Sequence, residues 1–192
     1  MSHNRFDIER YKEMALNLLS KLDDKVREEL EVILTDAAYL HVMEISKCES
    51  PIESILLMWL RHYFQAREQE YKQWDNFPLI TIEPQRTVER GKKKYRIDIA
   101  LDCSFKGKKH SFAIECDGHN FHEKTKEQAA RDKQRDRDLQ SMEYRVLRFT
   151  GSEIWDRPSK CAYDALKIVE KITGIHDEEI AYLQKIYPDN NW

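Results

Sequence analysis

The hydrophobic pattern of this 192-residue chain switches from helical to alternating at residues 77–78. From about residue 5 to residue 47, and again over 51–71, apolar side chains recur at helical spacing. Residues 80–117 instead alternate apolar and polar side chains and are rich in β-branched and aromatic residues. Because a strand needs neighbouring strands to satisfy its backbone, the switch predicts a helical first part followed by a sheet.

Helices and strands alternate in the second half of the chain. Ser50, Pro51 and Glu53 form a capping-box pattern with proline in the first turn, so we expect a helix to begin there. The expected strands are 80–89, 94–103, 109–117 and 144–149, and the expected helices are 51–71, 123–142, 158–174 and a short one before Pro188.

The helix over 123–142 would be a crossover between two strands, which predicts a mixed sheet. The fold class is therefore α/β, with a mixed central sheet flanked by helices. We expect a helical N-terminal extension over residues 1–47 and the main domain over residues 48–192.

Composition excludes two broad classes of protein. With 41% hydrophobic and 35% charged residues, the chain is too apolar for disorder and too charged for a membrane protein. The first residues lack the layout of a signal peptide, and the four cysteines form no Cys-x-x-Cys pair. We expect a cytoplasmic protein with reduced thiols and no membrane partner.

The net charge of −3 hides a local basic stretch. Residues 85–110 contain nine lysines and arginines and three acids, a local charge of 9 − 3 = +6. Such a hairpin can follow nucleic-acid phosphates, or it can simply keep an edge strand soluble. Composition alone leaves both interpretations open.

Carboxylates recur on two successive predicted strands. Because side chains alternate along a strand, Asp98 shares a face with Ala100 and Asp102, while Glu115 and Asp117 share a face of the next strand. The opposite, apolar face of the first of these strands is predicted to hold Ile97, Ile99, Leu101 and Cys103.

A register that sets Asp98 beside Glu115 would gather these acids in one cavity. Their repulsion would then be relieved by protonation or by a cation, and Mg²⁺ is the typical partner of carboxylate and phosphate oxygens. The alternative is that each acid is a solvated residue of a half-exposed sheet. The turn that follows is rich in functional groups: His119 fits an ordinary loop residue, whereas His122 fits a phosphate contact or proton carrier.

Several short motifs, taken in order, resemble the endonuclease-like family related to very-short-patch repair endonucleases. That family belongs to the PD-(D/E)xK restriction-endonuclease-like superfamily. The motifs cover about residues 50–155 and are Ser50–Glu53, Tyr95–Asp98, Ile114–Gly118, Arg131-Asp132, Arg135-Asp136, Leu139 and Tyr144–Phe149.

The resemblance implies a metal-dependent DNA endonuclease of restriction-endonuclease-like fold that uses Mg²⁺, with Mn²⁺ as a substitute. Asp98 resembles the first metal-binding acid of the superfamily and Glu115 the second. Asp117 stands where many members have a lysine, so it would bind metal or accept a proton from water. The missing positive charge would come from Lys94, Lys124, His122 or a second Mg²⁺.

Other positions carry two interpretations. Glu53 resembles a helix-borne acid that reaches the same metal site, yet its capping-box spacing explains it equally well. Gln85 is similar in place to a polar residue near such sites, and Glu143 stands where relatives close the helix with a glycine.

Basic residues on the strands and on the predicted 123–142 helix are candidates for DNA contact. For Arg135 the alternative is a buried ion pair with Asp132, and Arg148 faces the same choice. The candidate DNA-binding residues are Lys93, Lys94, Arg96, Arg131, Arg135 and Arg148.

Two rival functions remain open at this stage. The chain could be a nucleic-acid-binding or regulatory module that keeps the nuclease fold without cutting, because fold does not guarantee function. The N-terminal helical segment could also dock a partner protein or a second copy of the chain, although core packing explains its apolar stripe as well.

Overall fold

A computed structural model of the chain describes residues 17, 20–21, 23–26, 41–72, 74, 77–118 and 126–186. The chain divides into two compact units, residues 1–43 and 44–192. In the first unit, residues 24–26 and 41–43 are helical. Most of the predicted N-terminal extension lies outside the described residues, so its domain boundary and its proposed docking role stay predictions.

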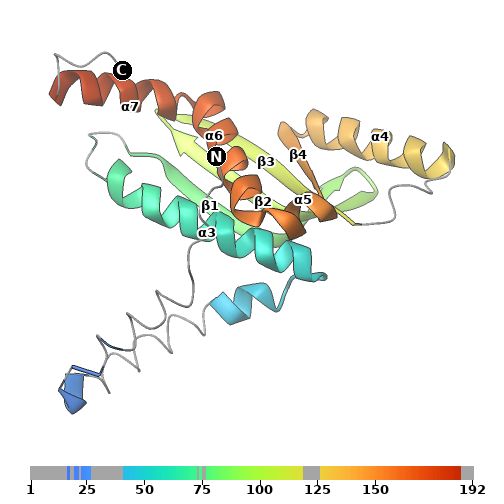
Figure 1. Cartoon of the computed structure of the whole chain (residues 1–192). Coiled ribbons are helices and arrows are strands. Elements are labelled where there is room, and N and C mark those ends of the chain that lie inside the picture. Colours follow the sequence, from blue (N-terminus) through green and yellow to red (C-terminus); the bar gives the residue numbers. More distant parts are fainter. Residues whose placement is uncertain are drawn as a thin grey trace. The chain divides into compact units, whose positions relative to one another are not determined.

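The second unit contains four strands and five helices within the described residues (Figure 1). The order along the chain is α3 (Pro51–Tyr71), β1 (Leu79–Arg90), β2 (Lys93–Phe105), β3 (Lys108–Asp117), α4 (Lys126–Ser141), β4 (Tyr144–Thr150), α5 (Gly151–Asp156), α6 (Pro158–Thr173) and α7 (Ile175–Ile186).

The four strands form one sheet in the order β1-β2-β3-β4. The β1–β2 and β2–β3 pairs are antiparallel, whereas β3 and β4 are parallel and joined through α4. These pairings confirm the predicted mixed sheet with a helical crossover. The α/β fold class is therefore confirmed.

The start of α3 and the end of α4 have the backbone geometry that their local sequences predict. Ser50 caps α3, and its side chain accepts a hydrogen bond from the Glu53 N–H, as the capping-box pattern predicts. Glu143 has φ 66°, so the turn after α4 does use the left-handed conformation that glycine would adopt more easily. The six-residue helix α5 was not predicted, although Thr150 and Glu153 carry a complete capping box.

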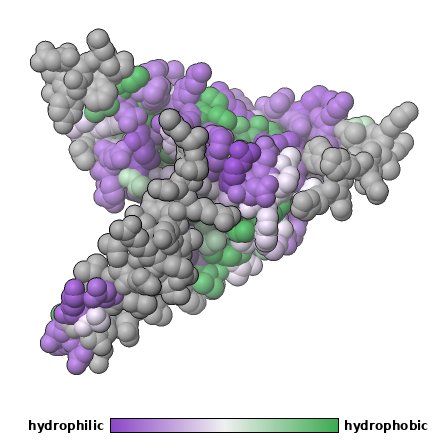
Figure 2. Space-filling view, viewed as in Figure 1, coloured by the Kyte–Doolittle hydropathy of each residue, from purple (hydrophilic) through white to green (hydrophobic). Residues whose placement is uncertain are grey.

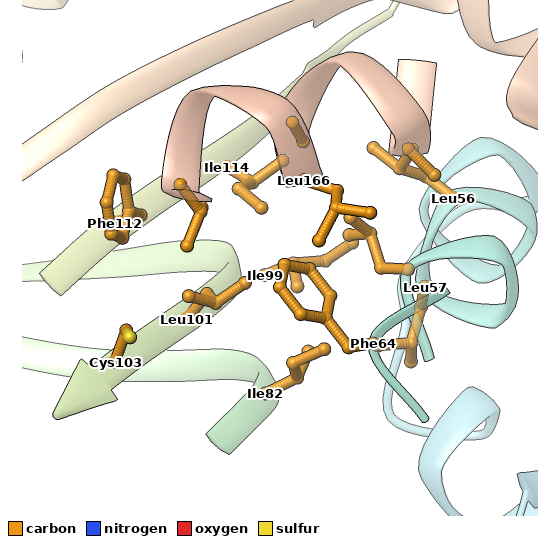
Figure 3. Packing of buried hydrophobic residues seen from close by; sticks show 14 of the residues in the cluster. Leu56, Leu57, Phe64, Ile82, Ile99, Leu101, Cys103, Phe112, Ile114 and Leu166 are labelled. Carbon is orange, nitrogen blue, oxygen red and sulfur yellow. The ribbon is translucent and has the colours of Figure 1, made fainter. Parts of the chain in front are cut away.

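One face of the sheet holds the main core (Figure 3). Leucines of α3 and α6 point toward the strands there, and Ile99, Leu101 and Ile114 meet them from the sheet. The opposite face holds a much smaller apolar cluster of Ile97, Ala100, Ala113 and Leu139, the last from α4.

Hydrophilic residues cover much of the coloured surface in Figure 2, with smaller hydrophobic areas between them. No helix in the part of the chain described here is long and apolar enough to cross a membrane.

Candidate active site

The side chains of β1 and β2 switch from one face of the sheet to the other at the same point along the two strands, and the candidate site lies there. Gln85 has φ 55°, and the ladder pairs Pro84 with Ile99 and Arg86 with Ile97 on either side of it. Ile99 packs in the main core, whereas Ile97 packs in the α4 cluster. The prediction that Ile97 and Ile99 share one face was therefore wrong, because alternation is interrupted between them at Asp98.

Asp98 lies at the same level as Glu115, as the metal-site hypothesis required. The last β2–β3 ladder pair is Ile99 with Ile114, and one residue further along each strand come Asp98 and Glu115. Asp98 Oδ2 accepts a hydrogen bond from the Cys116 N–H at 2.8 Å. Burial raises the pKa of Asp98, and the negative charge of Glu53 adds to the rise.

Glu115 is only 4% exposed and is held by an arginine of α4. Both carboxylate oxygens accept hydrogen bonds from Arg135, at 2.6 and 2.9 Å. Arg135 also donates to the carbonyl oxygen of Arg96, which fixes the guanidinium between β2 and β3. Burial raises the pKa of Glu115, and Asp98 adds to that rise while Arg135 opposes it.

Glu53 makes the predicted contacts of the helix cap and also bonds a residue of β1. Its Oε1 accepts from the Ser50 hydroxyl at 2.7 Å, which belongs to the helix cap. Its Oε2 accepts from the side-chain Nε2 of Gln85 at 2.7 Å, which joins α3 to the level of Asp98. Glu53 is buried, and its charge also acts on Cys116, whose thiol pKa is raised by burial and by Asp98, Glu53 and Glu115.

Asp117 points to a second arginine. Arg148 of β4 donates to Asp117 Oδ1 at 2.9 Å and also bonds Asp136 of α4. Arg148 therefore forms ion pairs with acids, which is the alternative to DNA contact that the sequence left open. One of these acids, Asp117, is itself a candidate site residue, two positions after Glu115.

The predicted DNA-binding residues do not form one free basic face. Lys93 reaches the buried Asp138 at 3.2 Å, Lys94 pairs with Glu89 at 2.8 Å, and Arg96 pairs with Glu49. These contacts match the interpretation in which a charged hairpin keeps an edge strand, here β1, soluble. Arg131 is exposed on α4.

Lys94 was one candidate for the missing lysine charge, and the structure places it on the exposed hairpin beside Glu89. His119, His122 and Lys124 lie outside the described residues. The cation that contacts Glu115 is Arg135, a residue that sequence analysis assigned only to DNA contact or to a pair with Asp132. Its signal was helical spacing, because Arg135 lies one turn before the fully buried Leu139.

The donor set around Asp98 fits a hard divalent cation. Among the residues that the structure describes, no three His, Cys, Asp or Glu side chains surround one point as a ready metal centre. Mg²⁺ needs only one or two protein carboxylates, however, and completes its shell with water and phosphate. Asp98 and Glu115 are the two carboxylates that could hold such an ion, and the side-chain Oε1 of Gln85 is buried without a hydrogen-bond partner among the described residues. Asp117 fits less well because Arg148 binds it.

These features define an α/β domain with a buried and a half-buried acid at the end of the β2–β3 ladder. The comparison with protein families agrees, since the model of REase_MTES_1575, a restriction-endonuclease-like family, matches residues 80–169. The match confirms the restriction-endonuclease-like part of the resemblance over that segment. No curated protein and no solved structure matches the chain.

Proposed function

We propose that this domain hydrolyses phosphodiester bonds in DNA with the help of Mg²⁺, with Mn²⁺ as a substitute. The observation that carries the proposal is the pair Asp98 and Glu115, a half-buried and a buried carboxylate at one level of the sheet, within the segment that matches the restriction-endonuclease-like family. Both pKa values are raised by burial, which is typical of acids placed for chemistry and not for solvation.

In this proposal Asp98 and Glu115 hold the metal. When bound, the metal would polarise the scissile phosphate and lower the pKa of a coordinated water. Asp117 would orient or deprotonate the attacking water. His122 is proposed as a proton carrier or phosphate contact.

Arg135 would supply the positive charge that lysine gives in many members of the superfamily. Its guanidinium already touches Glu115, so it stands beside the place where phosphate charge would develop. Because Arg135 occupies both oxygens of Glu115, a metal ion must displace at least one of these hydrogen bonds. Arg148, bound to Asp117 and Asp136, would contact an adjacent phosphate.

Glu53 is proposed to act through Gln85, keeping its amide beside Asp98. The relation to very-short-patch repair endonucleases and a role in repair, restriction or phage defence belong to this proposal. So does a cytoplasmic location, which suits four free thiols.

The test is cleavage of supercoiled plasmid and of a short single strand with Mg²⁺, Mn²⁺ or EDTA. The isosteric double variant Asp98→Asn, Glu115→Gln should lose cleavage by roughly a thousand-fold or more, about 4 kcal/mol in the activation barrier. The control Glu83→Gln, Glu89→Gln removes the same charge from exposed positions of β1 and should cut normally.

Two other results would contradict the proposal. Cutting that survives in the double variant would place the active site elsewhere. If the wild type and both variants bind DNA without metal and none of them cuts it, the result would instead support a binding or regulatory module. The ion pairs of Glu115 and Asp117 are compatible with that function too.

A further inference from the structure

An open pocket of about 610 Å³ lies at the end of β3 opposite to Glu115. It is formed by the start of β3, the end of α4 and the start of β4. Its lining residues are Lys108, Lys109, His110, Gln140, Tyr144 and Arg145, together with Glu143.

The charges around this pocket favour an anion. Lys109 is balanced by Asp102 at 3.3 Å. Lys108 and Arg145, in contrast, form no ion pair with an acid in the described part of the chain, and both are exposed. The carboxylate of Glu143 offsets one positive charge, so the pocket keeps a net positive charge of 3 − 1 = +2 before Asp102 is counted.

The hydrogen-bonding groups of the pocket are mainly donors. Arg145 lies 3.3 Å from Nδ1 of His110, and because a guanidinium cannot accept a hydrogen bond, this ring nitrogen must be the acceptor. In the neutral ring this contact places the proton on Nε2, where it can be donated. Burial lowers the pKa of His110, and the positive charges of Arg145 and Lys108 lower it further, which agrees with a neutral ring.

Tyr144 adds a further donor. Tyr144 lines the pocket, and its phenol hydroxyl carries a proton that can be donated. A ligand that matches an ammonium, a guanidinium, an imidazole N–H and a phenol together needs several acceptor oxygens and negative charge. A phosphate group has both.

We propose that this pocket binds a phosphate group, separately from the candidate active site. The site does not depend on cleavage by Asp98 and Glu115. Glu115 lies five positions after His110 along β3, a distance of roughly 16 Å in an extended strand. A nucleic acid that ran along the strand could place one phosphate in the pocket and another near Glu115.

The test follows the His110 ring by NMR in the full-length protein, with EDTA present so that nothing is cut. The probes are inorganic phosphate, a 5′-phosphorylated single-stranded 12-mer and the same 12-mer with a 5′-hydroxyl, each at constant ionic strength set with chloride. His110→Gln assigns the signal. An anion in the pocket should raise the pKa of His110, because it offsets the charges of Lys108 and Arg145.

The double variant Lys108→Gln, Arg145→Gln should lose at least about ten-fold in phosphate or oligonucleotide affinity, as expected for two charged contacts. The matched control Arg157→Gln, Lys160→Gln removes one exposed arginine and one exposed lysine elsewhere and should bind normally. Both positions of the test variant are exposed, so the fold should survive, which circular dichroism checks.

The probes separate the sources of the phosphate. A response to inorganic phosphate identifies a free phosphate site, and a response to the oligonucleotides alone identifies a backbone contact. No response of His110 to any probe, or equal losses in the test and control variants, would overturn the proposal. Neither result bears on cleavage, so the nuclease proposal stands or falls separately.

Discussion

The two faces of the sheet are built from neighbouring residues of the same strands but are held by different forces. On the α3 and α6 face, Phe112 and Ile114 are fully buried among apolar side chains. On the α4 face, Ala113 and Glu115 meet a helix with a single buried leucine, Leu139.

Ion pairs replace apolar area on the α4 face. Arg135 binds Glu115, Arg86 binds Asp102, and Asp138 gathers Arg90, Lys93 and Tyr95. A face held by paired charges responds to pH and can exchange a protein partner for a metal or a phosphate, which a close-packed apolar face cannot. The candidate chemistry therefore lies on the weakly apolar side, and the following changes test that division.

Phe112→Ala should give the largest loss of stability. The ring is fully buried in the main core, so its removal should cost about 3–5 kcal/mol in the free energy of unfolding, measured in urea. Because no charge is involved, the loss should be equal at pH 5 and pH 7. A loss below about 1 kcal/mol would show that this face is not the main core.

Arg135→Gln should come next, with a loss of about 2 kcal/mol at pH 7, because it leaves the buried Glu115 without its cation. The pKa of Glu115, already raised by burial, should rise further. A carboxyl with a raised folded pKa destabilises the protein when ionised, so the loss should shrink as the pH falls and Glu115 takes up a proton.

Arg137→Gln is the matched control for Arg135→Gln, since Arg137 is exposed and bonds only Gln134 of its own helix in the described contacts. Equal effects in the two variants, in urea unfolding at pH 5 and pH 7, would contradict the role of Arg135 as the partner of Glu115.

Asp138→Asn should destabilise the protein less than Arg135→Gln, because its partners Arg90 and Lys93 are half-exposed and regain water. The hydrogen bond from Tyr95 is the main cause that lowers the pKa of Asp138. A lowered folded pKa gives stability that is present above the unfolded value of about 3.9 and is lost as the pH falls through the folded pKa.

The difference between wild type and Asp138→Asn should therefore be full at pH 7 and shrink below about pH 4. Thermal unfolding across this range measures it, with Asp164→Asn as control, since Asp164 pairs with Lys160 at 2.7 Å on the surface. A difference that is constant with pH would show that Asp138 acts by packing and not by charge.

Lys94→Ala should have the smallest effect, below about 0.5 kcal/mol, because its pair with Glu89 is solvent-exposed. Urea unfolding in low and high salt measures it. A loss above about 1 kcal/mol would mean that the hairpin contributes to stability through charge as much as the α4 face does.

Local chemistry in the sequence was enough to predict most elements of the second unit. The period switch near Phe77 and Pro78 gave the strands, the capping box at Ser50 gave α3, and the polar 126–141 helix was correctly interpreted as a crossover. Side-chain alternation and register also brought Asp98 and Glu115 to one level. These features depend on neighbours along the chain or on one strand pairing, which a sequence records directly.

The tertiary structure alone decided which partners those acids have. Ile97 left its predicted face because β1 and β2 change faces together at Gln85 and Asp98, which no single strand pattern contains. The sequence did not indicate the partner of Arg135, which the fold of the crossover helix α4 places on Glu115 of β3. Burial and pairing arise when segments far apart in the chain meet, and these contacts set the charge of the candidate active site.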